Sequence, residues 1–315
     1  MDINNILFTI AIPAFKSTFL RECIESILNQ TLQNFEIIIV NDDSPQDIDG
    51  IIIQYDDSRI KYYKNAKNFG AHDVIKNWNE CLKHATGDYI ICMGDDDMLK
   101  PNCLKDYQDL ISLYPQYDIY HTRTEIIDEN SNVIDILDGR PTTESVFAMI
   151  WYLWRGRRQF IGDWLFKTKP LKERGGFFFL PYAWGADHIS AFEAAKEKGV
   201  ANVQNIGFMY RENRMNITKS TNNTDKKIEA MIKSRTWYEN FLKKAIPQDD
   251  SDFIYKELIS KKLYWYINRR IAFDLSELMS SNPINIFKWL FYKKKYNLSF
   301  KTIIFSFALS FYKNK

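Results

Sequence analysis

Three consecutive carboxylates, Asp95, Asp96 and Asp97, follow an apolar run at residues 89–93 that has the length and composition of a buried strand. We therefore expect the three side chains at the carboxyl edge of a sheet, where open α/β sheets bind ligands. Adjacent carboxylates repel one another, and a hard divalent cation, which prefers oxygen ligands, would relieve that repulsion. An acidic, solvated turn is the alternative interpretation of the triplet.

The segments around the triplet predict alternating strands and helices. Strands are expected at residues 6–12, 35–40, 60–63 and 89–93, and amphipathic helices at residues 17–30 and 74–85. This order is typical of an α/β fold with a mainly parallel sheet and crossover helices. The first, second and fourth strands then end at one edge, so the polar residues that follow them open onto the same crevice.

The overall composition describes an ordinary globular protein. The chain is 45% hydrophobic and 26% charged, and its net charge of +2 gives no argument for a nucleic-acid partner. Its four cysteines occupy apolar positions without a CxxC pair, so we expect reduced thiols in a cytosolic protein. We expect no signal peptide and no membrane-spanning helix, because no run of about 18 apolar residues occurs.

Three landmarks in the first hundred residues resemble one enzyme family when they are taken together. They are IAIPAF at residues 10–15, IIVNDDS at residues 38–44, and ATGDYIICMGDDDMLKP at residues 85–101. In this order and at these spacings the chain resembles the inverting glycosyltransferases of family 2. The resemblance implies a GT-A fold, a Rossmann-like nucleotide-sugar domain, at residues 1–220. The pattern of the remaining residues predicts an α-helical region at residues 221–315.

The resemblance implies that the loop after the first strand and the acidic end of the second strand hold a nucleotide. Asp42 matches the aspartate that accepts a hydrogen bond from the base, a contact that the ring N–H of uracil suits. Pro13, Ala14 and Phe15 would supply backbone groups and an apolar wall against the base or ribose. Asp43 stands where the family usually has glycine, so a different loop conformation is expected. A helix cap or a turn is the structural alternative for Asp42.

The residue that meets the donor's diphosphate stays open at this point. The family's usual Arg-Asn pair falls on Trp78 and Asn79, so the expected arginine is missing. Asn68 lies in a turn that matches the family upstream of this helix. Lys76 is a candidate for the diphosphate contact, and a solvated helix lysine is the alternative.

The family's acidic metal motif aligns with the triplet in two ways. As acid-x-acid-acid it begins on Gly94 and leaves Asp96 and Asp97, whereas Asp95, Asp96 and Asp97 also form an acid-x-acid motif as they stand. In both alignments we expect Asp96 and Asp97 to hold Mg²⁺ or Mn²⁺, which offsets the charge on the leaving nucleoside diphosphate. Asp95 and Asp96 would also lie against the donor, with Asp95 on its ribose or sugar.

The resemblance also implies an acceptor side with a general base. An inverting transfer needs one carboxylate to take the proton of the acceptor hydroxyl as that oxygen attacks the anomeric carbon. Asp187, which opens a predicted helix just after Trp184, matches the family's base, and a helix-capping role is its alternative. The candidates for contact with the acceptor or the diphosphate are Trp184, Arg211 and Arg214. Asn213 lies between the two arginines, where the family often has histidine.

The last hundred residues have a helical pattern, with breaks near Pro247 and Pro283. The tail at residues 284–315 has seven lysines and no acidic residue among many aromatic and aliphatic side chains. This composition is typical of a helix in the interface of an anionic membrane. A helical appendage that packs on the catalytic domain with its lysines solvated is the other interpretation.

The sequence therefore predicts a metal-dependent inverting glycosyltransferase of cell-surface polysaccharide synthesis. It would move a sugar from a nucleoside diphosphate sugar, first of all a UDP-sugar, to a hydroxyl of a glycan or of a lipid-linked oligosaccharide. We expect it in the cytoplasm, peripheral at the inner face of the cell membrane. The alternative is a catalytically degenerate relative that serves as a nucleotide-binding or scaffold subunit, which the changes at Asp43, Trp78, Ala186 and Asn213 would favour.

Overall fold

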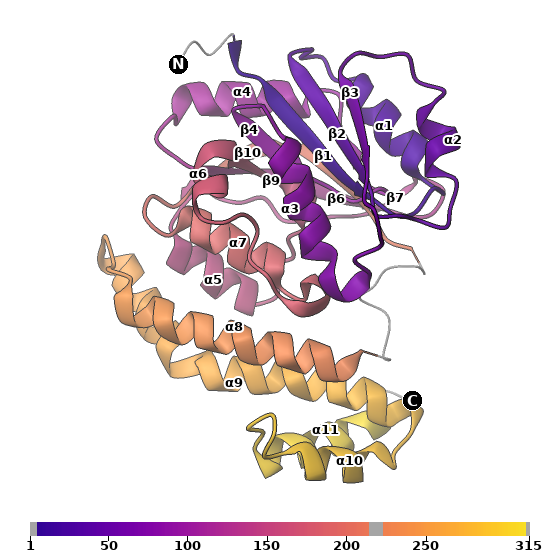
Figure 1. The fold of residues 1–315 in the computed structure, drawn as a ribbon. Helices are drawn as coiled ribbons and strands as arrows, with labels where there is room; N and C mark the ends of the chain where they lie inside the picture. Colours follow the sequence, from indigo (N-terminus) through magenta and orange to yellow (C-terminus); the bar gives the residue numbers. More distant parts are fainter. Residues whose placement is uncertain (1–4, 214–222, 313–315) are drawn as a thin grey trace. The chain divides into compact units, whose positions relative to one another are not determined.

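The computed structural model describes residues 5–213 and 223–312 (Figure 1). Their strands form one ten-stranded sheet in the order β3-β2-β1-β4-β9-β6-β10-β5, with β7 paired to β6 and β8 to β10. The strands are β1 (Phe8–Ala14), β2 (Phe35–Asn41), β3 (Ile60–Lys64), β4 (Tyr89–Cys92), β5 (Met98–Leu99), β6 (Ile119–Ile127), β7 (Val133–Ile136), β8 (Thr143–Glu144), β9 (Trp164–Lys167) and β10 (Val200–Arg211).

Helices connect these strands and continue beyond them. The helices are α1 (Leu20–Leu28), α2 (Ile48–Ile52), α3 (Val74–His84), α4 (Cys103–Leu113), α5 (Val146–Trp154), α6 (Thr168–Glu173), α7 (Ala186–Ala195), α8 (Thr224–Lys244), α9 (Asp250–Ser281), α10 (Asn285–Tyr292) and α11 (Phe300–Tyr312), with 3-10 turns η2 (Ala71–Asp73), η3 (Ile161–Asp163) and η4 (Pro181–Ala183). Side chains cap the N-termini of α2, α5 and α9: Asp47 accepts the N–H of Gly50 at 2.8 Å, Ser145 that of Ala148 at 3.2 Å, and Asp249 that of Asp252 at 2.8 Å.

The sheet is mixed, with a parallel part that holds the predicted site. Strands β3, β2, β1 and β4 run parallel to one another, and β6 runs parallel to β10. Strand β9 lies antiparallel between β4 and β6 and joins the two parallel groups. The predicted α/β fold with a mainly parallel central sheet is confirmed.

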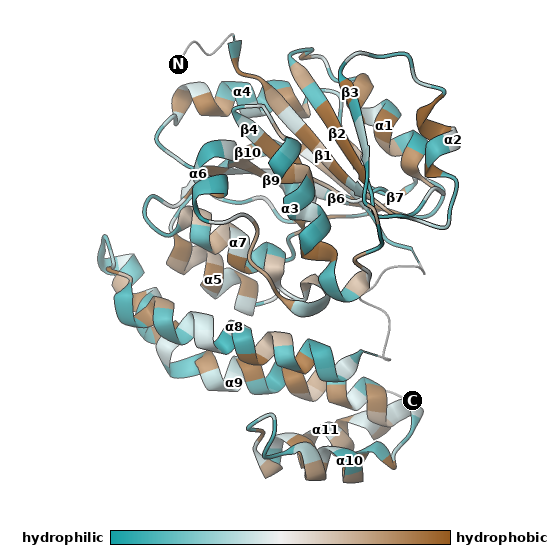
Figure 2. Ribbon diagram, in the orientation of Figure 1, coloured by the Kyte–Doolittle hydropathy of each residue, from teal (hydrophilic) through white to brown (hydrophobic). Residues whose placement is uncertain are grey.

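The central parallel strands β1 and β2 are largely apolar, as expected for strands that are buried on both faces. All residues of β2 are buried, and β1 is buried except at Pro13. Figure 2 shows β1 and β2 largely in brown, the hydrophobic end of its scale. Apolar side chains at helical spacing pack α1 onto this core: Leu20, Cys23, Ile24 and Ile27 are all buried.

Strand β1 continues through Pro13, two residues beyond the predicted end at Ile12. The carbonyl of Ala11 accepts the N–H of Met93 at 3.0 Å, so by strand alternation Pro13 faces the same side, toward β4. Strand β4 ends at Cys92, so no β4 residue lies opposite Pro13. The backbone hydrogen bond that proline cannot donate is therefore not required at this position. On the other side the strand reaches Ala14, whose carbonyl accepts the N–H of Asp42 at 3.0 Å.

The described residues group into two compact units. The first contains those of residues 1–179 and 186–214, and the second those of residues 180–185 and 215–315. The second unit holds helices α8–α11, so the predicted C-terminal helical region is confirmed, although its tail forms two helices where one was expected. The predicted domain boundary at residue 220 stays a prediction. Within the described ranges, no helix has both the length and the apolarity needed to cross a membrane.

Candidate active site

The first carboxylate of the triplet, Asp95, ties the end of β4 to the loop after β1. Its Oδ2 accepts the backbone N–H of Phe15 at 2.7 Å and that of Lys16 at 2.6 Å. Burial raises the pKa of Asp95 to about 6, against the opposing effect of the Lys16 charge. Asp95 therefore places the loop of the predicted nucleotide site directly beside the predicted metal ligands.

The other two carboxylates are buried on the same loop and have different partners. Asp97 Oδ1 accepts the N–H of Arg211 at 3.0 Å, and its Oδ2 accepts that of Gly94 at 3.2 Å. Asp96 Oδ2 accepts a hydrogen bond from Asn213 Nδ2 at 2.7 Å. Burial, with the neighbouring charge of Asp96, raises the pKa of Asp97 well above its ordinary value. Asn213 thus contacts the triplet from the position where the family often has histidine.

Gly94 allows the second and third carboxylates to converge. A Cβ at this position would lie 2.9 Å from Asp96 Oδ1 and 2.9 Å from Asp97 Oδ2. Both oxygens therefore occupy the space next to the Gly94 Cα that any side chain would need. Gly94 stands at the first position of the acid-x-acid-acid alignment. The close approach of these two carboxylates explains why this chain has glycine there.

Lys16 is a site residue that the sequence reasoning missed. Its Nζ forms an ion pair and hydrogen bond with Asp96 Oδ2 and lies 3.7 Å from Asp95 Oδ1. Burial alone would lower the pKa of Lys16, but the charges of Asp95, Asp96 and Asp97 outweigh it and raise this pKa. The available signal was its position directly after β1, at the same sheet edge as the triplet.

The residues present fit a divalent cation. Asp96 and Asp97 offer carboxylate oxygens, the ligands that Mg²⁺ and Mn²⁺ prefer, and Mg²⁺ commonly takes one or two carboxylates together with phosphates and water. Burial and the neighbouring Asp96 carboxylate raise the pKa of Asp97, and the charge of a bound cation would oppose both effects. Within residues 5–213 and 223–312, no three His, Cys, Asp or Glu side chains form a metal-ligating group.

The predicted nucleotide residues come together at the edge where β1 and β2 end. The Asp42 side chain is buried, and its Oδ1 accepts hydrogen bonds from Asn65 Nδ2 at 2.9 Å and from the N–H of Phe69 at 3.0 Å. Ala14 is buried and Pro13 half-buried, whereas Phe15 is 40% exposed. An exposed aromatic ring beside a buried carboxylate suits a flat, hydrogen-bonding base.

Asp43 keeps the backbone conformation of the glycine it replaces. Its φ is +49°, in the left-handed region that favours glycine, and its side chain is exposed. Asparagine and aspartate are the non-glycine residues that best tolerate this region, because their short polar side chains bond locally. The expected change in loop conformation is therefore not seen at the φ of this residue.

The candidates for the diphosphate contact have other partners in the structure. Lys76 is exposed and its Nζ lies 2.5 Å from Oδ2 of Asp73, the N-cap residue of α3. Asn79 Oδ1 accepts the N–H of Phe177 at 2.8 Å, and Trp78 packs edge-on against the Phe177 ring at 5.7 Å. The family's Arg-Asn positions thus hold the loop around Phe177 in this chain.

Asn68 and Trp184 are two further predicted site residues. Asn68 is exposed, in the turn before Gly70, whose φ is +75°. Trp184 belongs to the second unit, where the Nζ of Lys227 lies 4.2 Å from its ring centroid in a cation–π contact.

The predicted base, Asp187, is half-buried in the first turn of α7. Helix α7 begins at Ala186, so Asp187 lies inside the helix and not at the capping position considered as its alternative. Its Oδ2 lies 3.5 Å from Nε2 of His188. A side chain in the first turn lies near the positive end of the helix dipole.

A further buried carboxylate, Asp163, was not predicted. Its Oδ2 accepts the N–H of Phe160 at 3.0 Å and the hydroxyl of Thr124 at 3.2 Å, and lies 3.6 Å from His121 Nε2. Burial raises the pKa of Asp163 to about 8 although Arg140 opposes the shift. Burial lowers the pKa of His121 well below its ordinary value, so this ring is neutral and unsuited to anchor a phosphate.

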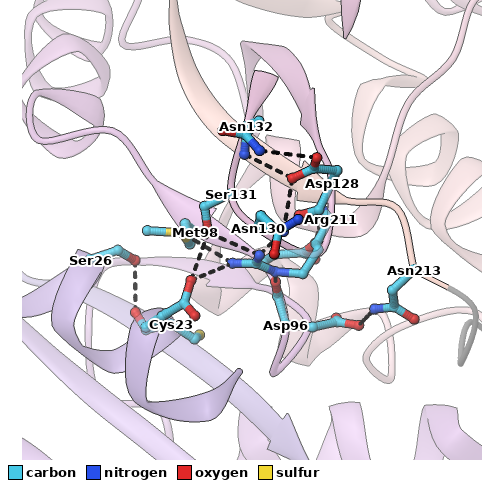
Figure 3. Close-up of polar contacts among 12 residues, drawn as sticks. Cys23, Ser26, Asp96, Met98, Asp128, Asn130, Ser131, Asn132, Arg211 and Asn213 are labelled. Carbon is cyan, nitrogen blue, oxygen red and sulfur yellow. Dashed lines mark hydrogen bonds and ion pairs between the residues drawn. The ribbon is translucent and has the colours of Figure 1, made fainter. Parts of the chain in front are cut away.

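Arg211 braces the acidic loop of residues 95–97 from within the protein (Figure 3). Its side chain is 0% exposed, and its Nε donates to the carbonyl of Asp96 at 2.8 Å. The two terminal nitrogens donate to Glu22 Oε2 at 2.8 Å and to the Asp128 carbonyl at 3.1 Å. Arg211 is thus a positioning residue in this structure, and Arg214, the other predicted arginine, lies outside the described residues.

Comparison with known proteins agrees with this architecture. An uncharacterised glycosyltransferase of Rickettsia typhi is 30% identical over 169 residues, which cover 51% of this chain and 52% of the relative. The GalNAc(5)-diNAcBac-PP-undecaprenol beta-1,3-glucosyltransferase of Campylobacter jejuni is 33% identical over 99 residues, 30% of this chain and 31% of its own length. The chain thus spans about half the length of the first relative and less of the second.

Solved structures share the fold. The crystal structure of S. aureus TarS 1–349 in complex with UDP-GlcNAc superposes with a TM-score of 0.66 at 16% identity, covering 88% of this chain and 76% of that one. Residues 9–175, more than half of the chain, match the family described as Glycosyl transferase family 2. With its three landmarks, its sheet and this match in agreement, the chain belongs to glycosyl transferase family 2.

Proposed function

We propose that this chain is a metal-dependent inverting glycosyltransferase that takes its sugar from a UDP-sugar. The observation that carries the proposal is the shared sheet edge, where Asp95 holds the loop with Phe15 beside Asp96 and Asp97. That edge combines an aromatic wall, a buried carboxylate and oxygen ligands, as a nucleoside diphosphate with its cation requires. The TarS structure with the same fold holds UDP-GlcNAc, which supports a UDP-sugar as the donor.

Each part of the donor would meet a different group at this edge. Phe15 would pack against the base or ribose, and Asp42 would accept a hydrogen bond from the ring N–H of uracil. Asp96 and Asp97 would hold Mg²⁺ or Mn²⁺, which would stabilise the negative charge on the departing diphosphate. Asp95 keeps these two groups in register through its bonds to the β1 loop.

Asp187 would act as the general base. Its carboxylate accepts the proton of the acceptor hydroxyl while that oxygen forms the new bond to the anomeric carbon. The bond from this carbon to the diphosphate oxygen breaks on the opposite face, so UDP leaves and the anomeric configuration inverts. We place this chemistry in a catalytic domain at residues 1–220, with residues 221–315 as a helical region.

The donor is tested by thermal shift with UDP, GDP, dTDP and CDP, each with and without Mn²⁺. A ligand at about a hundred times its dissociation constant stabilises a protein by roughly 2.7 kcal/mol, which is measurable. We expect a Mn²⁺-dependent shift with UDP, followed by UDP release from UDP-sugars when a hydroxyl acceptor is present. Nucleotide binding without turnover on any acceptor would instead support the scaffold role, and no shift with any nucleotide would contradict the proposal.

The acceptor is proposed to be a glycan or a lipid-linked oligosaccharide of cell-surface polysaccharide synthesis. The C. jejuni relative, by its name, glucosylates a diphospho-undecaprenol-linked glycan. A lipid-linked acceptor would place the enzyme at the inner face of the cell membrane, in contact with anionic lipid. Surface polysaccharide intermediates on such lipids are therefore the first acceptors to test.

The tail of the second unit suits this contact. Helix α10 buries Trp289 but exposes Phe287 and Phe291, which are 71% and 83% exposed. Helix α11 packs on α9 and exposes Phe300, Phe305 and Phe311. Lysines and no carboxylates stand among these rings, at positions 288, 293, 294, 295 and 301. Exposed aromatic rings between lysines favour insertion at an anionic interface.

Vesicle sedimentation tests the membrane contact. We expect binding to phosphatidylcholine vesicles that contain phosphatidylglycerol, weaker binding at high salt, and little binding to phosphatidylcholine alone. The double variant Phe287→Ser, Phe291→Ser should bind at least tenfold more weakly, because it removes two exposed rings. Phe253→Ser, at an exposed ring of α9, is the matched control. Equal binding by both variants would contradict a role of the tail.

A further inference from the structure

The ammonium of Lys16 occupies the space beside the carboxylates that were assigned to a cation. Its Nζ contacts Asp96 Oδ2 and lies 3.7 Å from Asp95 Oδ1. The Lys16 side chain is only 21% exposed, and its backbone N–H is held by Asp95 Oδ2 at 2.6 Å. Both ends of the residue are therefore bound to the acidic triplet.

The oxygen that Lys16 contacts has a second donor. Asn213 Nδ2 donates to the same Asp96 Oδ2 at 2.7 Å. A divalent cation that coordinates this oxygen would meet a positive charge and an N–H donor already in place. Like charges at contact distance repel strongly in a buried site, so the cation and the ammonium cannot both stay on this oxygen.

We propose that Lys16 is a built-in counter-cation that competes with the divalent metal for Asp96. In the nucleotide-free protein the ammonium neutralises part of the triplet and weakens metal binding. When the metal binds, the Lys16 side chain leaves Asp96 by rotation about its four-carbon stem, since its backbone stays tied to Asp95. This inference rests on the proposed cation and nucleotide sites. It adds that Lys16 couples the occupation of one site to that of the other.

The diphosphate of the donor would give the displaced ammonium a new partner. Because the donor binds at the same edge, its negative oxygens attract Lys16 away from Asp96 and favour metal binding there. Binding of the nucleoside diphosphate and of the metal is then positively coupled, and the coupling is the same in both directions. Without the lysine, the metal would bind tightly even in the absence of nucleotide, and the nucleoside diphosphate would raise the metal affinity by a smaller factor.

Manganese titrations followed by electron paramagnetic resonance test this competition without measuring transfer. We expect Lys16→Met to bind Mn²⁺ alone at least tenfold more tightly than the natural chain, and to gain less affinity when UDP is added. Lys16→Arg keeps the charge and should behave like the natural chain. Lys83→Met removes an exposed lysine paired with Glu80 and is the matched control.

Unchanged or weaker Mn²⁺ binding by a folded Lys16→Met variant would overturn the proposal. Absence of Mn²⁺ binding in every variant would overturn it together with the metal role of Asp96. Tight, UDP-coupled Mn²⁺ binding without sugar transfer would leave it standing while the proposed enzyme activity fails. The metal titration and the transfer assay therefore separate the two ideas.

A measurement on the natural chain avoids any effect of substitution on folding. The amine of Lys16 is acylated with a water-soluble ester, and the extent is read at each lysine by mass spectrometry. Addition of Mg²⁺ should raise acylation at Lys16 several-fold relative to Lys83, because the displaced amine becomes accessible. Equal or lower acylation of Lys16 with Mg²⁺ would show that the ammonium stays on Asp96 and would overturn the proposal.

Discussion

Asp95 accepts the backbone N–H of Phe15 at 2.7 Å, across 80 residues of sequence. This bond joins the loop that follows β1 to the acidic loop that follows β4. A ligand that moves one of these loops is therefore expected to shift the other loop as well. The same carboxylate also accepts the N–H of Lys16, so two donors of one loop share one oxygen.

The first prediction concerns Gly94. Gly94→Ala places a Cβ 2.9 Å from both Asp96 Oδ1 and Asp97 Oδ2, which must then move apart. We expect Mn²⁺ affinity to fall at least tenfold, with UDP affinity in the absence of metal nearly unchanged, as measured by calorimetry. Gly139→Ala is the control, because nothing lies within 4 Å of its added Cβ. Unchanged Mn²⁺ binding in Gly94→Ala would contradict coordination by these two carboxylates.

The second prediction concerns the general base. Asp187→Asn keeps the size of the side chain but cannot take a proton, so transfer should fall by roughly 10²–10⁴-fold. UDP affinity should stay the same, because Asp187 lies on α7 and not on the nucleotide loops. Asp109→Asn, on the exposed side of α4, is the matched control. Parallel loss of transfer and nucleotide affinity would remove Asp187 from this role.

The third prediction concerns the stability contributed by Arg211. Arg211→Met leaves the Asp96 carbonyl without its donor, removes one of the two donors to the Asp128 carbonyl, and leaves Glu22 without its buried partner. It should cost about 3 kcal/mol of unfolding free energy. Arg158→Met, whose two ion pairs are exposed and 3.8–3.9 Å long, should cost less than about 1 kcal/mol. Urea denaturation measures both values. Similar losses in the two variants would show that the buried guanidinium does not brace the loop.

The fourth prediction concerns the pH dependence of stability. Burial raises the pKa of Asp163 from 3.8 to about 8, so the folded protein holds this proton more tightly than the unfolded chain. The contribution of this proton to the stability of the fold is therefore complete below the pKa of Asp163 in the unfolded chain, and it is lost as the pH rises toward 8. In Asp163→Asn, the decrease in unfolding free energy between pH 5 and pH 8 should be smaller by ~1 kcal/mol or more.

Denaturation curves at several pH values test this effect. The matched variant is Asp118→Asn, because this carboxylate pairs with Lys167 and Lys198 at the surface. It should leave the slope of stability against pH nearly unchanged over the same range. A natural chain whose stability does not fall between pH 5 and pH 8 would mean that Asp163 ionises normally.

The sequence by itself determined the α/β fold, the family and the strands that end at the site. These features depend on local pattern: continuous apolar runs, helical periodicity and an acidic triplet after a strand. The backbone conformation at Asp43 shows the limit of such patterns, because a departure from glycine was visible but its positive φ was not.

Only the tertiary structure decided which groups surround the triplet. Lys16, Arg211 and Asn213 reach it from β1 and the end of β10, and their distance in sequence leaves no periodic signal. The buried pairing of Asp163 with Thr124 likewise depends on how β6 and η3 pack. Burial and long-range pairing set the charges of these groups, and a linear sequence contains neither quantity.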